Sequence, residues 1–546
     1  MRRNTPASTP RISPKHNFLF VSDLHLAEGI DPQTGKVAPL EDFFFDNAFA
    51  NMLVYHVDLA AGANISSAFQ KPWKLYINGD FLEFLQVTSV PDENSADVQN
   101  GKIAVTDHLR QYGLGTSASE TVWKLNRIAG GHQTFFQALG WFLAHPENEL
   151  VLMRGNHDVE TVWQEVQEAM RTTIKASYYV WYRDMIDGRA PESPLPLRDD
   201  LPAALPDDYV DRIHFPEWFD YEEGLFYVEH GNQYDPVNSF SSIDRPFLED
   251  DQSRIELPSG SFFVRYLFNT IEQIHPFADN IRPLSSYIHY ALSHNPSETL
   301  GMLLRQPALT LKAVLNLLGK SGKMRPEMPT EDDTVSRFPL PNDCVRLIED
   351  IRYKATRISR RRNRRYIRGV IAGVLLRTLF WFFVVIAITN FIFGNILLMF
   401  LSLLFAAGDY LIRLKLMRFL NSSESVVGLR EVSEAINYVL NEHTHLNGDG
   451  HSSAVQFLIF GHDHNPRFEE LSQHQNGRSY RQWYVNTGSW LPSYDESERV
   501  IRNAVQLPFL RIVPDRIGFD NALPELLEWH DAERRPYRLR LIEKPK

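Results

Sequence analysis

Residues 369–408 form an apolar run in which Arg377 is the only charged residue. A helix that crosses a bilayer needs about 20 apolar residues to cover ~30 Å of hydrocarbon. This run is roughly twice that length, and Asn390, Gly394 and Asn395 interrupt it near its middle. The pattern predicts a transmembrane helical hairpin that crosses the membrane and returns.

Basic residues flank this run on both sides. Residues 354–368, KATRISRRRNRRYIR, contain eight Lys and Arg and no acid, and Arg413, Lys415 and Arg418 follow the run. Because Lys and Arg collect on the cytoplasmic side of spanning helices, we expect both flanks in the cytoplasm, with Arg377 snorkelling to the interface. Two alternatives stay open: a helical hairpin buried in a soluble protein, and a basic anchor that lies on anionic lipid.

The remaining composition is that of a globular protein with more than one structural unit. A chain of 546 residues is too long for one compact core. The net charge of −12 argues against a nucleic-acid partner. The single cysteine, Cys344, excludes an intrachain disulfide and indicates a reducing compartment. Residues 1–17 contain no apolar core of a signal peptide, so we expect no secretory signal. Nothing in the sequence indicates an oligomeric state.

Short apolar runs alternate with longer, helix-compatible stretches in the first 240 residues, which predicts an α/β fold. A Pro- and Asp-rich segment, 188–210, is expected to be a loop. Strand character returns at 454–490, and the tail segment RPYRLRLIEK alternates like a half-buried strand. We therefore predict a catalytic core in two parts, 17–240 and 446–546, that are separated by a mainly helical insertion, 241–445.

Polar clusters follow five of the strand-like runs directly. They are Asp23-Leu-His25 after NFLFVS, Gly79-Asp80 after WKLYIN, Gly155-Asn156-His157-Asp158 after ELVLMR, His230-Gly231 after GLFYVE, and Gly461-His462-Asp463-His464 after AVQFLIF. Each cluster alone is a weak signal, because turns often contain such residues. Ligand sites of open α/β sheets lie at the carboxyl ends of strands. Five clusters in this one position predict a common site.

The residue types in these clusters are those of a metal site. Carboxylate, imidazole and carboxamide ligands suit Mn, Fe, Zn or Mg better than a thiophilic metal. The candidate ligands are Asp23, His25, Asp80, Asn156, His230, His462 and His464. Seven ligands are too many for one ion, and with Asp80 as a bridge they suit two ions about 3.5–4 Å apart. The glycines before Asp80, Asn156 and His462 permit the sharp turns that bring the ligands together.

The five clusters, in this order, resemble the pattern of the calcineurin-like metallophosphoesterase family: D-x-H, G-D, G-N-H-D/E, H and G-H-x-H. The resemblance covers residues 17–235 and 454–490. It implies a four-layer αββα sandwich whose core the helical insertion interrupts. The chain departs from the pattern at Glu83, where many members have Asp, and this departure concerns a residue behind the metal ligands.

The resemblance also implies a role for each residue of the site. One ion would bind Asp23, His25 and His464, the other would bind Asn156, His230 and His462, and Asp80 would bridge them. A hydroxide held between the ions, with Mn favoured, would attack phosphorus in line. His157 would donate a proton or hydrogen bond to the leaving oxygen, and Asp158 would orient its ring. A pair of cations also stabilises the charge that develops on a phosphoryl group.

The expected function is thus hydrolysis of a phosphoester or pyrophosphate at the cytoplasmic face of a membrane. The apolar insertion resembles, in part, the arrangement of UDP-2,3-diacylglucosamine pyrophosphohydrolase-type enzymes, which implies a lipid-linked or nucleotide-sugar pyrophosphate. A soluble nucleotide or protein phosphoester, cleaved by an enzyme that the hairpin only anchors, is the first alternative. A membrane-tethered scaffold without activity is the second.

A second His-x-His pair, His443 and His445, stands in a different context. It ends a helix-like stretch, EVSEAINYVLNEHTH, and no strand precedes it. Histidines near the C-terminus of a helix interact favourably with the helix dipole. We therefore interpret this pair as a helix cap and not as a metal site.

Overall fold

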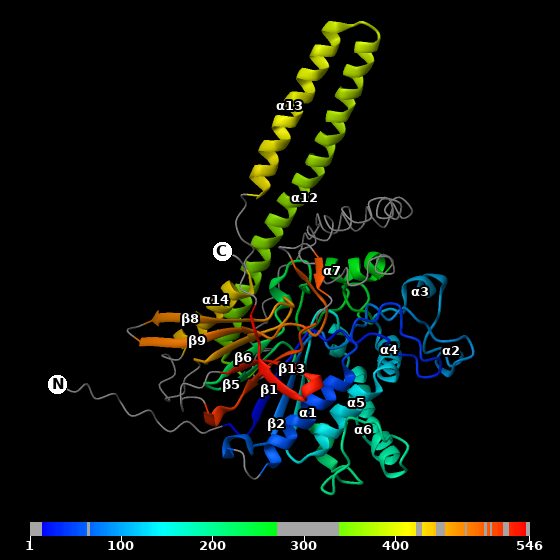
Figure 1. Cartoon of the computed structure of the whole chain (residues 1–546), viewed down its shortest axis with the longest axis vertical. Helices are drawn as coiled ribbons and strands as arrows, with labels where there is room; N and C mark the ends of the chain where they lie inside the picture. Colours follow the sequence, from blue (N-terminus) through cyan, green and yellow to red (C-terminus); the bar gives the residue numbers. More distant parts are fainter. Residues whose placement is uncertain are drawn as a thin grey trace, which may run out of the picture.

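The computed structural model describes residues 14–62, 66–269, 338–421, 428–443, 454–475, 478–495, 500–502, 505–516 and 524–541. Within these ranges the chain has two mixed sheets with helices packed on them, which confirms the predicted α/β class (Figure 1). The strands expected from the apolar runs are present, and residues 188–206 contain neither helix nor strand.

A seven-stranded sheet contains the first three predicted strands. Its order is β14 (Arg535–Arg538), β13 (Glu525–His530), β12 (Pro508–Ile512), β1 (Asn17–Val21), β2 (Trp73–Asn78), β3 (Glu149–Met153) and β4 (Ile213–His214). Strands β1 to β4 are parallel, and β12 to β14 add antiparallel strands at one side. Parallel pairing brings the carboxyl ends of β1, β2 and β3 to one edge of the sheet.

A five-stranded sheet joins the two predicted parts of the core. Its order is β5 (Phe219–Glu222), β6 (Phe226–Glu229), β7 (Phe457–Phe460), β9 (Arg478–Asn486) and β8 (Arg467–Gln475). Strands β6, β7 and β9 are parallel, whereas β5 and β8 pair antiparallel with their neighbours. Because β6 and β7 are direct neighbours, chain segments on either side of the predicted insertion belong to one sheet.

The two sheets pack face to face through a buried aromatic cluster. Phe20 and Tyr76 of the first sheet stack with ring centres 4.8 Å apart, and Phe226 of the second sheet meets Phe20 edge-on at 5.1 Å. The Tyr76 hydroxyl donates a hydrogen bond to Asp220 at 2.8 Å, which also crosses the interface. The contact fixes the strand ends of one sheet relative to those of the other.

Helices cover the outer face of the seven-stranded sheet. They are α1 (Asp46–Ala61), α4 (Ala118–Gly131), α5 (Gln133–Ala144) and α6 (Gln164–Ile186). Their apolar faces and the sheet form the largest buried cluster, in which Trp73, Trp141 and Trp181 are almost completely buried. Smaller elements are α2 (Ala96–Gln99), α3 (Asp107–Tyr112), α7 (Ser259–Phe263), β10 (Ser493–Asp495) and β11 (Val500–Arg502).

Two helices of the predicted insertion cover the outer face of the five-stranded sheet. The first turns of α12 (Asn342–Ile392) and the whole of α14 (Leu429–His443) pack on it. Cys344 and Ile348 of α12, and Ile436 and Leu440 of α14, are fully buried in this contact. These two segments thus belong to the folded core, although they lie within 241–445.

Helix α12 continues out of the core and pairs with α13 (Ile396–Asn421), so that the two form a hairpin that projects from the body (Figure 1). The turn between them lies at 393–395, where the sequence predicted it. Among the described helices, Leu375–Ile392 is long and apolar enough to cross a membrane, and Ile396–Ile412 is a shorter apolar stretch. Only 6% of Leu375–Ile392 is buried.

A buried histidine, His132, ties α1 to the junction of α4 and α5. Its ring nitrogens lie 3.1 Å from a Glu41 oxygen and 3.2 Å from an Asp46 oxygen. Burial alone would lower the pKa of His132, but the hydrogen bonds to Asp46 and Glu41 raise the pKa to about 9. The imidazolium is therefore part of the folded structure at neutral pH.

This raised pKa predicts a pH-dependent contribution to stability. The contribution is fully present below the unfolded pKa near 6.5 and disappears as the pH rises through about 9, with a total of up to about 3 kcal/mol. We expect His132→Gln to lower the free energy of unfolding in detergent much more at pH 6 than at pH 9.5. An equal loss at both pH values would show that His132 folds uncharged.

Candidate metal centre

The candidate site lies where the carboxyl ends of the parallel strands of both sheets meet. Asp23 and His25 follow β1, Asp80 follows β2, and Asn156 and His157 follow β3. His230 follows β6, and His462 and His464 follow β7. All eight side chains are at least nine-tenths buried. The structure thus brings six of the seven predicted metal ligands into two groups, from segments up to several hundred residues apart, and Asn156 is buried in the loop between Gly155 and His157.

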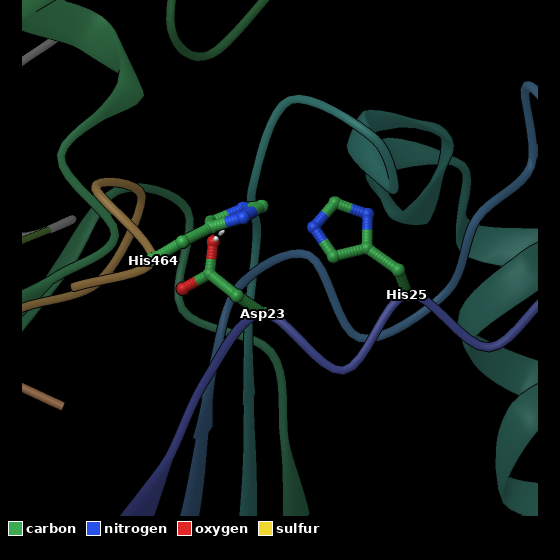
Figure 2. A group of neighbouring side chains, drawn as sticks. All are labelled: Asp23, His25 and His464. Carbon is green, nitrogen blue, oxygen red and sulfur yellow. Dashed lines mark ion pairs between the residues drawn. The ribbon is translucent and has the colours of Figure 1, made fainter. Parts of the chain in front are cut away.

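Among the described residues, three groups could hold a metal ion, because one ligand atom of each member lies within 4.8 Å of the others. The first is Asp23, His25 and His464, and a further group, His25, Glu83 and His157, shares His25 with it. Figure 2 shows the ion pair in this group, in which Asp23 Oδ1 lies 3.2 Å from His464 Nε2. The rings of His25 and His464 lie 5.2 Å apart. The other Asp23 oxygen accepts hydrogen bonds from Ser22 Oγ and from the His462 backbone N–H, which leaves Oδ1 for the group.

Asp80, His230 and His462 form the second group by the same criterion. Asp80 Oδ2 lies 3.1 Å from His230 Nε2 and 3.8 Å from Nε2 of His25, a member of the first group. The Asp80 carboxylate therefore lies between the first and second groups, and its bridging role stays a prediction. His230 Nδ1 lies 2.8 Å from the Asn78 carbonyl, so Nδ1 donates there and Nε2 faces the group.

Several ligand atoms of the site have no hydrogen bond anywhere in the described part of the chain. They are Asp23 Oδ1, His25 Nε2, Asp80 Oδ2, His230 Nε2 and both polar atoms of the Asn156 side chain. Buried polar atoms without partners are costly, and native proteins retain few of them. Apart from the two Asn156 atoms, they belong to the two ligand groups and contact other ligand atoms in ion pairs at 3.1–3.8 Å. Divalent cations within these groups would satisfy them, and the donor set suits such ions.

Five predicted ligands have a left-handed backbone. Their φ angles are +54° for Asp23, +50° for His25, +49° for Asp80, +68° for His462 and +55° for His464. Only Glu147 and Arg534 share this property among the described non-glycine residues. Such a conformation costs roughly 1–3 kcal/mol per residue and occurs mainly at functional sites. The concentration at this site indicates that the fold holds these side chains in place against local strain.

The glycines next to the ligands are required by crowding. A Cβ atom on Gly79, whose φ is +82°, would lie 2.5 Å from the His230 ring. A Cβ on Gly155 would overlap the Asp80 carboxylate and backbone N, and one on Gly461 would lie 2.5 Å from Ser22 Oγ. The turns therefore pass one another at distances that only glycine allows.

Glu83 connects two histidines of the site from behind. One of its oxygens lies 2.9 Å from His25 Nδ1 and also contacts His157 Nδ1. A carboxylate behind an imidazole fixes the tautomer and directs Nε2 forward. Burial alone would raise the pKa of Glu83, but the charge of His157 lowers the pKa below its usual value. The glutamate at the position where the sequence departs from the family pattern thus makes direct contacts within the site.

Asp158 was predicted to orient the His157 ring, but its carboxylate has other partners. Its Oδ1 accepts the Gly155 N–H at 2.7 Å, and its Oδ2 accepts the Phe81 N–H at 2.8 Å. Asp158 therefore braces the loops that follow β3 and β2, and Glu83 holds the His157 ring. Burial, and then the charge of Asp80, raise the pKa of Asp158 to about 6.

The buried charges of the site depend on one another. Burial alone would raise the pKa of Asp80, but the charges of His230 and His157 lower the pKa well below its usual range. Burial likewise lowers the pKa of His230, and Asp80 then raises it to about 9. Two fully buried carboxylates, Asp23 and Asp80, are thus kept ionised by positive charge at the strand ends. Cations at the same place would replace protons on the histidines.

Two further polar residues adjoin the ligands. Asn486, at the end of β9, accepts the Gly488 N–H through Oδ1 at 2.9 Å, which forms an Asx-turn, and donates to the Gly461 carbonyl at 2.6 Å. Asp235 Oδ2 lies 3.3 Å from His462 Nε2, and sequence reasoning missed it. It sits five positions after His230 without a strand before it, so no sequence signal marked it.

The second His-x-His pair, His443 and His445, is described only in part. Helix α14 ends at His443, whereas His445 lies outside the described residues. Its interpretation as a helix cap therefore stays a prediction. Comparisons with family models, curated proteins and solved structures found no match to this chain.

The crowding at Gly155 leads to a specific prediction. We expect Gly155→Ala to reduce bound Mn²⁺ to less than half of the wild-type amount after gel filtration, because the new methyl group displaces the Asp80 carboxylate. Metal content is measured by atomic emission. Gly130→Ala, in α4 with open space around its Cα, is the matched control and should bind metal like the wild type. Equal metal in both variants would contradict the site geometry.

Proposed function

We propose that the protein is a dinuclear metal-dependent phosphoester hydrolase of the calcineurin-like metallophosphoesterase type, attached to a membrane through its hairpin. The observation that carries the proposal is the pair of buried ligand groups that share the Asp80 region, with unsatisfied ligand atoms in both. The order of helices, sheet, sheet and helices agrees with the four-layer αββα sandwich that the resemblance implies.

The assignment of ligands follows the two groups. Asp23, His25 and His464 would hold one ion, His230, His462 and Asn156 would hold the other, and Asp80 would contact both. Mn²⁺ is the favoured ion, with Fe, Zn and Mg as alternatives, since the ligands are oxygen and imidazole nitrogen. When bound, such a pair polarises the phosphoryl oxygens and lowers the pKa of a water molecule.

His157 supplies the proton in this proposal. Its Nδ1 contacts Glu83, so Nε2 is the nitrogen that would donate to a leaving oxygen. The His157 backbone N–H donates to Asp80 Oδ1 at 2.9 Å, which fixes the distance between the acid and the bridging carboxylate. Glu83 holds the ring and favours its protonated form, as a general acid requires.

The hairpin supports the proposed attachment to a membrane. Trp381, Phe391 and Leu397 are 57%, 69% and 75% exposed, and their neighbours along α12 and α13 are similarly apolar and exposed. Exposed apolar patches of this kind mark membrane or protein contacts, and the basic residues 354–368 suit the anionic cytoplasmic leaflet. We therefore propose that the catalytic body lies on the cytoplasmic side.

The substrate is proposed as a class only. A lipid-linked or nucleotide-sugar pyrophosphate fits a membrane-bound enzyme, and a soluble nucleotide or protein phosphoester is the alternative. An inactive scaffold would need no complete ligand set, whereas all seven predicted ligands are present and buried, and six of them lie in the two groups. This completeness favours an enzyme.

Removal of the central carboxylate is expected to abolish activity. Asp80→Ala should reduce Mn²⁺-dependent hydrolysis of bis-p-nitrophenyl phosphate, p-nitrophenyl phosphate or UDP-sugar lipids by on the order of 10³-fold or more. Asp199→Ala, which removes an exposed carboxylate, is the matched control. Activity that survives Asp80→Ala would sink the two-metal proposal, and absence of activity in both variants on every substrate class would favour the scaffold.

The role of His157 predicts a dependence on the leaving group. His157→Gln should lower kcat on the order of 10²-fold or more for an alkyl phosphoester, whose leaving oxygen needs a proton. The loss should be less than about tenfold for a p-nitrophenyl ester, whose leaving group is already stable as an anion. Equal losses on both substrates would mean that His157 only shapes the site.

A further inference from the structure

The hairpin turn divides the apolar run into unequal legs. On α12 the leg from Gly369 to the turn is about 36 Å long, whereas on α13 the leg from Ile396 to Gly408 is only about 20 Å, at 1.5 Å per residue. Asp409, Arg413, Lys415 and Arg418 follow on α13. Because the helices pack side by side, the shorter leg sets how much of the hairpin can lie in hydrocarbon.

The charged residues of both legs mark the same level. Arg377 lies about 23 Å before the end of α12, and Asp409 lies about 20 Å after the start of α13. Contacts between the legs agree with this register, since Phe383 stacks on Phe405 at 5.4 Å and Phe380 lies 6.4 Å from Tyr410. A hairpin immersed up to this level would reach roughly 20–25 Å into hydrocarbon that is ~30 Å thick.

Aromatic residues of the interfacial type occur only at this level. Within 369–421, Trp381 and Tyr410 are the sole Trp and Tyr, and both lie close to Arg377 or Asp409. Both are exposed, at 57% and 43%. Spanning helices carry such residues at both membrane surfaces. One belt at the base and none at the tip indicates a single membrane surface.

Five large apolar side chains at the tip of the hairpin are exposed, next to the exposed Gly394 and Asn395. Phe391, Ile392 and Phe393 at the end of α12 are 69%, 70% and 73% exposed, and Ile396 and Leu397 on α13 are 62% and 75% exposed. In a hairpin that crosses the membrane twice, the tip lies in water on the far side. These five side chains would then be hydrated, which opposes that placement.

The backbone of the tip is able to lie in hydrocarbon. The N–H groups of residues 393, 394, 395 and 396 all donate to carbonyl groups within the turn. Gly394, with φ of +76°, and the bond from Asn395 N to Asn390 O form a Schellman-type end of α12. Nearby polar side chains also bond to the backbone, for example Asn390 to Ile386 O at 3.0 Å and Ser402 to Leu398 O at 2.8 Å. Lipid tolerates irregular backbone only where its polar groups are satisfied.

We infer that the hairpin is a one-sided membrane insert, which enters the bilayer from the cytoplasmic face and ends inside the hydrocarbon. Its occupant is the acyl region of a phospholipid bilayer with an anionic cytoplasmic leaflet, to which the basic residues 354–368 are complementary. The inference rests on the membrane attachment proposed above and does not depend on the catalytic chemistry. It accounts for both basic flanks on one side without a second crossing.

Cysteine labelling of the full-length chain tests this topology. Cys344 is buried in α12 and is the only cysteine, so Cys344→Ala provides the background. Asn395→Cys marks the exposed tip, and Glu192→Cys marks an exposed loop of the body. An impermeant maleimide is added to inverted and to right-side-out vesicles from expressing bacteria, with and without detergent.

The one-sided insert predicts a distinct labelling pattern. Glu192→Cys should react in inverted vesicles only, and Asn395→Cys should react in neither preparation until detergent is added. A fluorophore attached at Asn395→Cys in detergent and reconstituted should be quenched by lipids with acyl-chain quenchers and not by aqueous iodide.

Other outcomes overturn the inference in recognisable ways. Reaction of Asn395→Cys in right-side-out vesicles means two crossings, and reaction in inverted vesicles means that the hairpin lies on the surface. If the chain stays in the supernatant without detergent and has the mass of two copies, the apolar surfaces of two hairpins cover each other. Recovery there at any mass also removes the proposed membrane attachment, whereas the two labelling results leave it standing.

Discussion

Two buried carboxylates, Asp23 and Asp80, are the constraint on which the rest of the structure depends. Both are completely buried and both face imidazole nitrogens across distances of 3.1–3.2 Å. Their charge in a low-dielectric interior requires positive charge close by. The surrounding backbone is held in left-handed conformations at five ligands, which together costs on the order of 5–15 kcal/mol. That cost is comparable to the net stability of a typical domain, so the packing of the fold must offset it, and the proposed cations would add to that stabilisation.

The architecture explains how so many ligands reach one place. Parallel strands in both sheets end at the same edge, and the aromatic contact of Phe20, Tyr76 and Phe226 fixes one sheet against the other. Glycines at 79, 155 and 461 let the turns approach until ligands from different strands touch. Because the N-terminal turns of α12 also pack on the second sheet, the helix that forms the hairpin is built into the same body as the site. The helix of the proposed membrane insert therefore also packs on the sheet whose strand ends carry part of the proposed catalytic centre.

Most of the site could be predicted from the sequence because each ligand follows a strand. The ends of strands can be recognised from apolar runs and glycines. Asp158 was assigned to His157 since the two are adjacent in sequence, yet adjacent side chains on a turn point in different directions. The spatial neighbour of His157 is Glu83, from another loop, and Asp235 also came from a segment without a sequence signal. The α/β class was predictable, whereas the packing of α12 and α14 on the core was not. The apolar face of an amphipathic helix does not indicate which surface it packs against. The position of the turn at Gly394 was predictable, but the unequal legs matter only once the two helices are paired.

The account depends on two cations that share Asp80. Crystals soaked in Mn²⁺ and measured near the Mn absorption edge provide the most direct measurement, since anomalous scattering locates the ions without reference to activity. We predict two anomalous peaks about 3.5–4 Å apart, one beside Asp23, His25 and His464, the other beside Asn156, His230 and His462, with Asp80 between them. A single peak, or peaks that avoid the Asp80 carboxylate, would contradict the account.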